Sequence, residues 1–403
     1  MSAPAGAAAR TRPAVGVADG LRALSVALVV WFHFWQQDWL RPLLRLPFAL
    51  PGGVRSIDFS FLPRTGYLFV DFLLLLSGFC LFLPTAQAMA EGRPDAGRIA
   101  PGPFYRRRAA RILPGYYFCL LVILLTDVLP RWDETSAGHF WLDLLSHLTL
   151  TQTFFAPAYQ ATRFNGVLWT LAIEAQFYLL FPLLCRLFAR APRRCFAALQ
   201  GVSLASAAAL LAADSDLYLW VNQLPLLLGV YADGMLAAVV LARQRQRPPR
   251  AARTAACTAL ALASLAGILR LLRLQSATVR VQRSQLLLRL PLGLLFALLL
   301  VSLALAARPL RRLFDNRAAR FFAGISYGLY LWHQYLAVQL KYRWHLPAWS
   351  GQLPPNQTGD LLWQRRYALL ITAAALAAAL FSTYCIERPL GRRILAGRGA
   401  PGK

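Results

Sequence analysis

The chain has 403 residues, of which 58% are hydrophobic and only 15% are charged. Soluble domains carry about 25% charged residues, whereas here the apolar residues form runs of about twenty, long enough to cross a bilayer. The composition therefore excludes an ordinary soluble enzyme and predicts an all-α, polytopic transmembrane helical bundle that resides in the lipid bilayer.

The net charge of +26 would suit a nucleic-acid-binding protein, but the distribution of the arginines argues against that class. Lys and Arg lie mostly in short segments between the apolar runs, and they are more frequent in the segments that lie on the same side of the membrane as the N-terminus. Acidic residues favour the other side. This asymmetry is typical of the positive-inside rule. It predicts a multi-pass protein of the plasma or inner membrane, with both termini cytosolic and no nucleic-acid partner.

Ten membrane spans are predicted by the apolar runs. They lie at roughly 19–37, 66–84, 112–130, 167–186, 199–213, 218–241, 254–271, 290–307, 321–340 and 363–386. Residues 1–18 are expected to form a cytosolic tail, 19–388 the membrane domain and 389–403 a basic cytosolic tail. The segments 38–65 and 131–166 are candidates for extracellular substructure. The loop between the seventh and eighth spans breaks the charge rule, because its arginines (270, 273, 280, 283 and 289) fall outside.

The first span carries three ionisable residues along one edge. Arg22 and His33 are eleven residues apart, which at 100° per residue places them on the same face, about 16 Å apart along the axis. Asp19 precedes Arg22 by three residues, close enough to pair with it. A cleaved signal peptide would exclude such residues from its core, and no small-residue cleavage site follows, so the span is expected to be retained.

A run of arginines leads into the third span, in the sequence Arg106-Arg107-Arg108-Ala-Ala-Arg111. Such a cluster serves as a topology anchor on the cytosolic side. Arg108 and Arg111 are also one helical turn apart, so they could present two guanidinium groups on one face. That geometry suits phosphate groups.

Polar side chains also interrupt the second, fourth and ninth spans, which contain Asp71, Glu174 and His333 respectively. Counted from the span ends, they lie near the depth of His33. Ionisable groups inside a bilayer are costly and rarely occur without a function. One buried polar residue alone is usually a satisfied structural contact. Four at a similar depth in four spans predict a polar chamber inside the bundle.

No cofactor or metal motif is found in the sequence. The six cysteines have no paired or zinc-type spacing, and there is no phosphate-binding loop or dinucleotide fingerprint. We therefore expect neither a bound cofactor nor a metal.

With these motifs in place, the chain resembles the acyltransferase-3 family of integral-membrane acyltransferases, which O-acylate carbohydrates and some secondary metabolites. The resemblance extends over about residues 15–390, and Ala172 and Ala175 depart from it where the family usually has Ser and Glu. The stretches that carry it are Asp19-Gly-Leu-Arg22 with His33, Val70-Asp71 through Leu76-Ser77-Gly78-Phe79, Arg108 to Pro114, Trp169 through Glu174 to Tyr178, Ile325 to His333, and Ile386-Glu387-Arg388-Pro389.

The resemblance implies acyl transfer, most simply of acetyl, from acyl-CoA as co-substrate to a hydroxyl of a carbohydrate or glycosylated acceptor. It also implies a stand-alone membrane domain without the esterase-like domain of some relatives. An alcohol needs a general base to become a nucleophile, and His33 suits that role. Glu174 or Asp71 is expected to orient the imidazole or to stabilise its charged form.

The remaining polar and aromatic residues are given binding roles in this interpretation. Arg22, Arg108 and Arg111 are expected to hold the phosphates of the donor at the cytosolic side. Trp169, Tyr178, Tyr330 and His333 are expected to line the acceptor or acyl pocket, although aromatic residues at such positions also serve as packing or interfacial anchors.

A different class of function uses the same residues. Intramembrane His, Asp, Glu and Arg are what a proton relay needs, so a proton-coupled transporter or an acyl translocator is the alternative. The sequence has no matching pair of Gly- or Pro-interrupted spans of the kind that marks inverted-repeat carriers. Acyl transfer by purified protein supplied with acyl-CoA separates the two functions.

Overall fold

The computed structural model describes residues 16–50, 54–131, 137–213 and 217–396. In this part of the chain, ten helices have 21 to 26 residues, and at 1.5 Å per residue each is about as long as the 30 Å hydrocarbon core of a bilayer is thick. They are α1 (Gly16–Asp38), α3 (Phe69–Ala90), α4 (Pro101–Ile123), α7 (Trp169–Arg190), α8 (Pro192–Ala212), α10 (Leu224–Arg245), α11 (Ala251–Ser276), α12 (Val281–Leu305), α14 (Arg317–Tyr342) and α15 (Leu361–Phe381).

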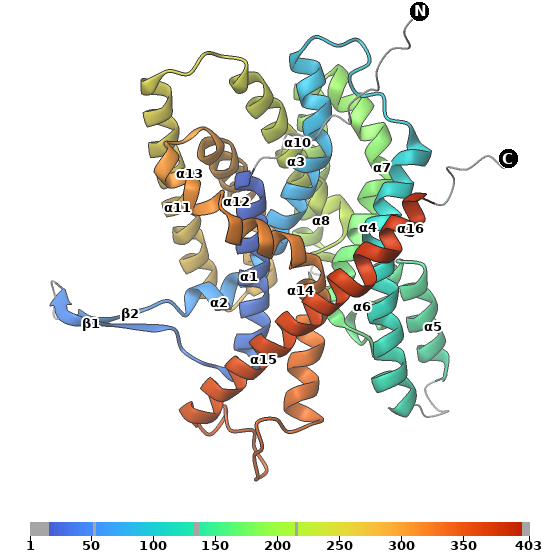
Figure 1. Cartoon of the computed structure of the whole chain (residues 1–403), viewed down its shortest axis with the longest axis vertical. Coiled ribbons are helices and arrows are strands. Elements are labelled where there is room, and N and C mark those ends of the chain that lie inside the picture. Colours follow the sequence, from blue (N-terminus) through green and yellow to red (C-terminus); the bar gives the residue numbers. More distant parts are fainter. Residues whose placement is uncertain (1–15, 51–53, 132–136, 214–216, 397–403) are drawn as a thin grey trace, which may run out of the picture.

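Shorter elements connect the long helices. The short helices are α2 (Phe61–Thr65), α5 (Ala137–Leu148), α6 (Ala156–Gln160), α9 (Leu217–Trp220), α13 (Arg308–Phe314) and α16 (Arg388–Ala396), and turns with π-helical hydrogen bonding follow α4 and α15 at Leu124–Val128 and Ser382–Glu387. Strands β1 (Leu43–Leu50) and β2 (Val54–Asp58) pair antiparallel, with Leu43 opposite Asp58. This hairpin projects sideways from the bundle in Figure 1.

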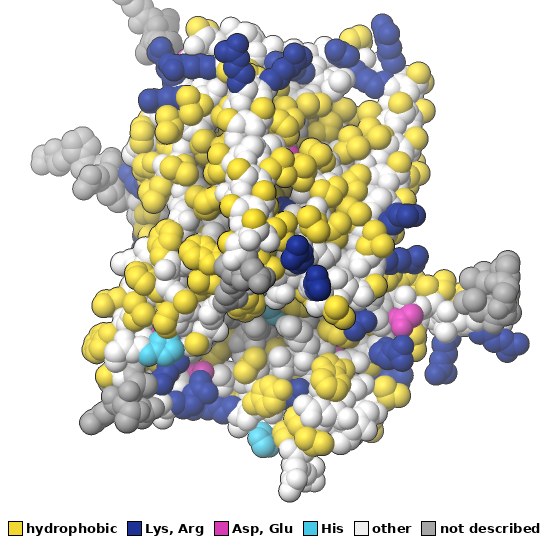
Figure 2. All heavy atoms as spheres, turned by 180° about the vertical axis from the view of Figure 1, so that it is seen from behind, with side chains coloured by type: hydrophobic (Ala, Val, Ile, Leu, Met, Phe, Trp, Pro, Cys, Tyr) yellow, Lys and Arg dark blue, Asp and Glu magenta, His cyan; other side chains and the backbone are white. Residues whose placement is uncertain are grey.

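The prediction of an all-α membrane bundle is confirmed. Nine helical segments within the described residues are long and apolar enough to span a bilayer. The remaining predicted span, 321–340, lies within the 26-residue helix α14. This helix is long enough to span a bilayer, but its Tyr, Trp, His and Gln residues lower its mean hydropathy, so it is not among the nine. Figure 2 agrees with membrane insertion, because a broad hydrophobic band crosses the surface and Lys and Arg side chains gather along its upper edge.

The packing centres on α3, which lies between α1, α7, α10 and α12. Glycines allow α3 and α10 to approach closely: a Cβ on Gly234 would lie 2.0 Å from the carbonyl oxygen of Leu75, and one on Gly78 would lie 2.6 Å from that of Tyr231. Small residues at helix crossings are the usual means of close packing in membranes. In α8 and α11, by contrast, only 17% and 22% of the apolar stretch is buried, so these helices lie at the rim.

The two predicted domain boundaries differ from the observed helix ends. The boundary at 18/19 falls inside α1, and the boundary at 388/389 falls inside the start of α16, which packs against α4. Residues 1–15 and 397–403, the outer parts of both predicted tails, lie outside the described residues. Helix α1 begins and α16 ends at the same end of the bundle (Figure 1). The predicted substructures hold the hairpin (38–65) and α5 and α6 (131–166).

Candidate functional site

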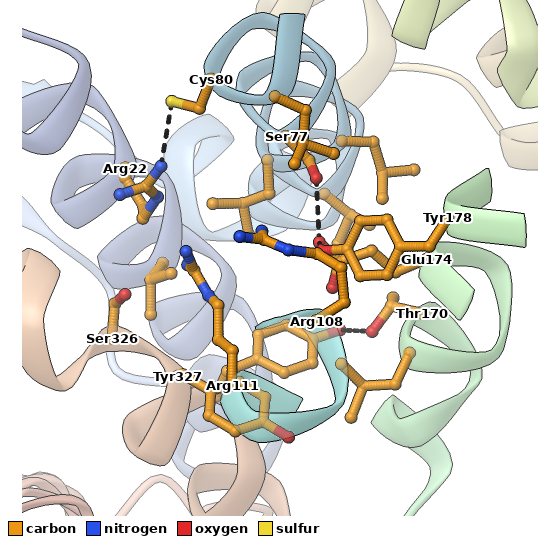
Figure 3. Close-up of a pocket in the computed structure, with 17 residues that line it drawn as sticks. Arg22, Ser77, Cys80, Arg108, Arg111, Thr170, Glu174, Tyr178, Ser326 and Tyr327 are labelled. Atoms are coloured by element: carbon orange, nitrogen blue, oxygen red, sulfur yellow. Dashed lines mark hydrogen bonds between the residues drawn. The ribbon is translucent and has the colours of Figure 1, made fainter. Parts of the chain in front are cut away.

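A small cavity lies among α1, α3, α4, α7 and α14, near the end of the bundle at which α1 begins (Figure 3). Its volume is about 120 Å³. We call it the arginine cavity. Its polar and tyrosine lining residues are Arg22, Ser77, Cys80, Arg108, Arg111, Thr170, Glu174, Tyr178, Ser326, Tyr327 and Tyr330.

Arg22 is held at the edge of this cavity by two neighbours. Its Nη1 lies 3.2 Å from Oδ1 of Asp19, in an ion pair whose side chains are largely buried, and its Nη2 donates to Sγ of Cys80 over 3.3 Å. The carboxylate belongs to the same turn of α1, and the thiol belongs to α3. Arg22 is therefore fixed where α1 and α3 meet, with its guanidinium group at the cavity.

Arg108 and Arg111 enter the same cavity from α4. The guanidinium carbon of Arg108 lies 5.7 Å from the ring centroid of Tyr178 and 5.9 Å from that of Phe104, which are cation–π distances. Its Nε is buried without a hydrogen-bond partner in the described part of the chain. In Figure 3 the guanidinium groups of Arg22, Arg108 and Arg111 point toward one another. Three like charges so arranged repel each other, and an anion between them would relieve that repulsion.

Glu174 is the acidic residue on the wall of this cavity. Its Oε1 accepts hydrogen bonds from Oγ of Ser77, over 3.0 Å, and from the hydroxyl of Tyr178. Ser77 precedes Cys80, the partner of Arg22, by three residues, or about one turn of α3. Glu174 is therefore nearer to the depth of the arginines than to the depth of His33, where the sequence had suggested it.

A wider cavity of about 520 Å³ lies at the mouth, next to the arginine cavity. The two share the lining residues Arg22, Arg111, Ser326 and Tyr327. Residues of α14 and α16 complete this mouth cavity. A ligand that enters at this end of the bundle would therefore meet the mouth cavity first and the arginine cavity next.

His33 lies further along α1, with a second histidine beside it. Its ring centroid is 5.1 Å from that of His333 on α14. Nδ1 of His33 donates to Oε1 of Gln36 over 3.1 Å, which leaves the lone pair on Nε2. His333 is fully buried, and its Nδ1 donates to the carbonyl oxygen of Tyr330 over 2.8 Å. The structure thus brings two of the predicted residues together at this depth.

The predicted pocket aromatics occupy different places. Tyr178 and Tyr330 line the arginine cavity, and the Tyr330 hydroxyl accepts from Oγ1 of Thr170 over 3.0 Å. Trp169 packs instead against Tyr159 of α6, with ring centroids 6.3 Å apart. Burial raises the pKa of Tyr159 to about 12, so its hydroxyl stays protonated at neutral pH.

Asp71 is paired with a residue that the sequence did not suggest. Its Oδ2 accepts from Nε of Arg289 over 3.0 Å, and both side chains are buried. Nη1 of Arg289 donates to the carbonyl oxygen of Val221 over 2.6 Å. Arg289 is one of the arginines that seemed to break the positive-inside rule. It belongs to the interior of the bundle, and the carboxylate of Asp71 neutralises it there.

Asp233 and Gln200 form a second buried polar contact that sequence reasoning missed. Nε2 of Gln200 donates to Oδ1 of Asp233 over 2.8 Å, between α8 and α10. A carboxylate in the middle of an apolar run was the available signal. Among the described residues, no three His, Cys, Asp or Glu side chains are grouped so as to hold a metal ion.

A polar cavity of about 500 Å³ opens at the opposite end of the bundle, near the end of α4. We call it the outer cavity. Asp127 is its central charge, because Oδ1 accepts from Nη1 of Arg343 over 3.0 Å and Oδ2 accepts from Arg131. Asn165 and Gln334 also line it. Amide, carboxylate and guanidinium groups together can hydrogen-bond a ligand that is rich in hydroxyls.

Comparison with known proteins gives a family match over nearly the whole chain. A family model described as an acyltransferase domain matches residues 17–386. A protein of Staphylococcus aureus (strain COL), provisionally named an O-acetyltransferase, is 27% identical over 173 residues, which are 41% of this chain and 24% of that protein. Acyltransferase MdmB of Streptomyces mycarofaciens is 30% identical over 129 residues, 32% of this chain and 31% of its own. These matches thus span about a quarter to a third of each relative, and no solved structure matches the chain significantly.

Proposed function

The chain belongs to the acyltransferase-3 family, as its motifs predict, and we propose that it transfers an acyl group from acyl-CoA to a hydroxyl of a carbohydrate or glycosylated acceptor. The most economical acyl group is acetyl, in keeping with the name of the S. aureus relative. The arginine-rich end of the bundle then faces the cytosol, where acyl-CoA is found, in a plasma or inner membrane.

The observation that carries this proposal is the convergence of Arg22, Arg108 and Arg111 on one cavity. Paired guanidinium groups bind phosphate through charge-assisted hydrogen bonds. The pyrophosphate of the donor is the matching anion. The stripe on α1 that begins at Arg22 leads to His33, about 16 Å away. The flexible pantetheine arm would follow this stripe and present the thioester to His33.

In the chemical step, Nε2 of His33 takes the proton of the acceptor hydroxyl while the oxygen attacks the thioester carbonyl. The carbon–sulfur bond then breaks, and the proton passes to the departing CoA thiolate, so that an ester and free CoA result. The hydrogen bond to Gln36 supports this role because it holds the proton on Nδ1. His333 lies where it could touch either the acceptor or the acyl group.

The two carboxylates receive separate roles in this proposal, because their contacts lie with other residues. Glu174 is bonded to Ser77 and Tyr178 in the arginine cavity, where it would offset part of the positive charge and position Tyr178. Asp71 is paired with Arg289, which suits a structural role. The outer cavity, at the opposite end from the arginines, suits a polyhydroxylated acceptor that arrives from outside.

The proposal is tested with protein purified into nanodiscs and supplied with radiolabelled acetyl-CoA and a panel of mono- and oligosaccharides. We expect labelled ester on at least one acceptor, located by mass spectrometry, and no transfer by the H33Q variant. Passage of acetyl-CoA or a proton across a sealed vesicle, without ester formation, would reject the proposal in favour of transport.

A further inference from the structure

Three arginines in the mouth cavity lie outside the arginine cavity. They are Arg320 of α14 and Arg388 and Arg392 of α16. They are not among the predicted site residues, although Arg388 belongs to the Ile386-Glu387-Arg388-Pro389 stretch. We propose that they form a second anionic subsite, which binds the 3′-phosphate on the ribose of the CoA donor. This inference rests on the proposed use of acyl-CoA.

The volumes of the two cavities determine which part of the CoA donor each one can hold. Pockets for drug-sized ligands usually enclose about 300–1,000 Å³. The arginine cavity, at about 120 Å³, can hold a pyrophosphate or part of a pantetheine arm, but not a nucleoside. The mouth cavity, at about 520 Å³, falls within the range. If the pyrophosphate lies at Arg22 and Arg111, which line both cavities, the adenosine end must lie in the mouth cavity.

The charges of the mouth cavity are not balanced from within. Arg320 is paired with Asp315, at 2.8 Å, and Arg22 is paired with Asp19. Glu387 also lines the cavity and accepts from Oγ of Ser382, so three carboxylates face the five arginines Arg22, Arg111, Arg320, Arg388 and Arg392. Arg388 stacks on the ring of Tyr384, 4.2 Å from its centroid, a contact that leaves its positive charge in place. Arg392 has no hydrogen-bond or ion-pair partner among the described residues. An excess of positive charge therefore remains at the mouth, as a dianionic phosphate monoester requires.

The elements that carry these arginines are fixed against the donor-side helices. A Cβ on Gly391 would lie 2.6 Å from the carbonyl oxygen of Ala110, so α16 and α4 touch backbone to backbone next to Arg111. Arg388 and Arg392 are one turn apart and share a face of α16. A Cβ on Gly324 would lie 3.6 Å from Nη2 of Arg388, which places that guanidinium beside α14. The three arginines thus belong to a defined part of the cavity and not to a free tail.

The test compares acetyl-CoA with 3′-dephospho-acetyl-CoA as donors for the same purified protein. Because hydrogen bonds to charged groups contribute about 1.5–3 kcal/mol, we expect the KM of the wild type to be about 10- to 150-fold higher for the dephospho donor. The double variant R388Q/R392Q keeps only Arg320, which is paired with Asp315, so its two KM values should differ much less than those of the wild type, with kcat unchanged. R393Q and R317Q remove charges from the same helices outside the cavity, and they should keep the wild-type preference.

A binding measurement keeps the inference independent of turnover. Adenosine 3′,5′-bisphosphate should bind the wild type more tightly than adenosine 5′-monophosphate, and R388Q/R392Q should lose most of this preference. Equal KM values for the two donors in the wild type would overturn the subsite while leaving the proposed reaction intact. If neither donor is used but the bisphosphate preference holds, the reaction fails and the subsite stands. If R388Q/R392Q alters only the binding of anionic lipid, compared in nanodiscs with and without phosphatidylglycerol, the arginines serve headgroups and the subsite is wrong.

Discussion

At the scale of single residues, the proposed reaction assigns donor binding and proton transfer to side chains that lie far apart on α1. Arg22 contacts Asp19 and Cys80, whereas His33 contacts Gln36 and His333. Because the two groups are separated by about 16 Å, donor binding and turnover should respond separately to substitution.

Substitution of His33 should abolish turnover without weakening donor binding. An amide cannot accept a proton near neutral pH, so H33Q should lower kcat about 10²- to 10⁴-fold, the usual contribution of general base catalysis. Donor affinity should stay at the wild-type value, because in the proposed binding mode the phosphates lie at Arg22, Arg108 and Arg111. The measurements are acetyl transfer per mole of monodisperse protein and equilibrium binding of acetyl-CoA. Near-normal turnover of H33Q would move the role of base to another residue.

Substitution of Arg108 should have the opposite pattern. R108Q should raise the KM for acetyl-CoA about 10- to 150-fold, since one charge-assisted contact of about 1.5–3 kcal/mol is lost. The KM for the acceptor should change little. The matched control is R106Q, which removes a charge two residues away on the same helix at an exposed position outside the cavity. Equal effects of R106Q and R108Q would reduce both arginines to topology anchors.

The buried pair of Asp71 and Arg289 should govern stability. Removing one partner of a buried ion pair leaves an uncompensated charge and costs about 3–5 kcal/mol, whereas replacing both with apolar residues of similar size is often tolerated. D71N and R289Q should therefore each lower the Tm in detergent, and D71L/R289M should recover most of it. If the double variant folds but has lost turnover, Asp71 takes part in catalysis, as the sequence interpretation had suggested.

At the scale of helices, the bundle depends on close crossings. A Cβ on Gly234 of α10 would meet the Leu75 carbonyl of α3 at 2.0 Å, whereas one on Gly201 of α8 would meet nothing within 4 Å. G234A should force the two helices apart and lower the Tm. G201A is the matched control and should leave the Tm unchanged or raise it, because Ala favours a helix over Gly. A Tm for G234A as high as that of G201A would contradict the observed packing.

Helix positions could be predicted from the apolar runs, but helix ends could not. The third span was predicted at 112–130, whereas α4 begins at Pro101. The arginines before the span are helical as well, and a proline suits the first turn of a helix. A prediction based on hydropathy does not include polar residues that continue a helix beyond its apolar run. For the same reason most of helix α16 was assigned to a predicted tail at 389–403, and the π-helical turn at Ser382–Glu387 was not distinguished from the tenth span.

The same limit applies to the candidate site. The spacing of Arg22 and His33 on one helix follows from helix geometry, so their common stripe could be predicted. The pairing of Asp71 with Arg289 joins residues 218 positions apart, and only the packing of α3 against α12 decides it. The depth of Glu174 was estimated by counting residues from the predicted end of its span, and this count placed it level with His33. An error of one turn in that boundary moves a residue by about 5 Å along the helix axis.

At the scale of the whole molecule, the bundle orders its cavities along one axis. The mouth cavity and the arginine cavity share Arg22 and Arg111 near the start of α1, and the outer cavity lies at the far end of α4. Such an order would let a cytosolic donor and an external acceptor reach the histidine pair from opposite sides. It requires the arginine-rich end to face the cytosol.

This orientation can be tested at the loop that breaks the charge rule. Helices α11 and α12 are joined by a short turn in which Val279 is 95% exposed, while the turn between α10 and α11 contains Arg250. On a background without the six native cysteines, a cysteine at 279 should react with a membrane-impermeant maleimide from outside. A cysteine at 250 should react only after the membrane is opened.

Arg280 and Arg283 flank position 279, and by charge alone they would draw this turn to the cytosol. Two features outweigh this effect of charge. Asp71 neutralises Arg289, and turning the α11–α12 pair around would break the contacts of α12 with α3 and α10. Labelling of 250 from outside, or protection of 279, would reverse the assignment of the two faces and remove the arginine cavity from the reach of cytosolic acyl-CoA.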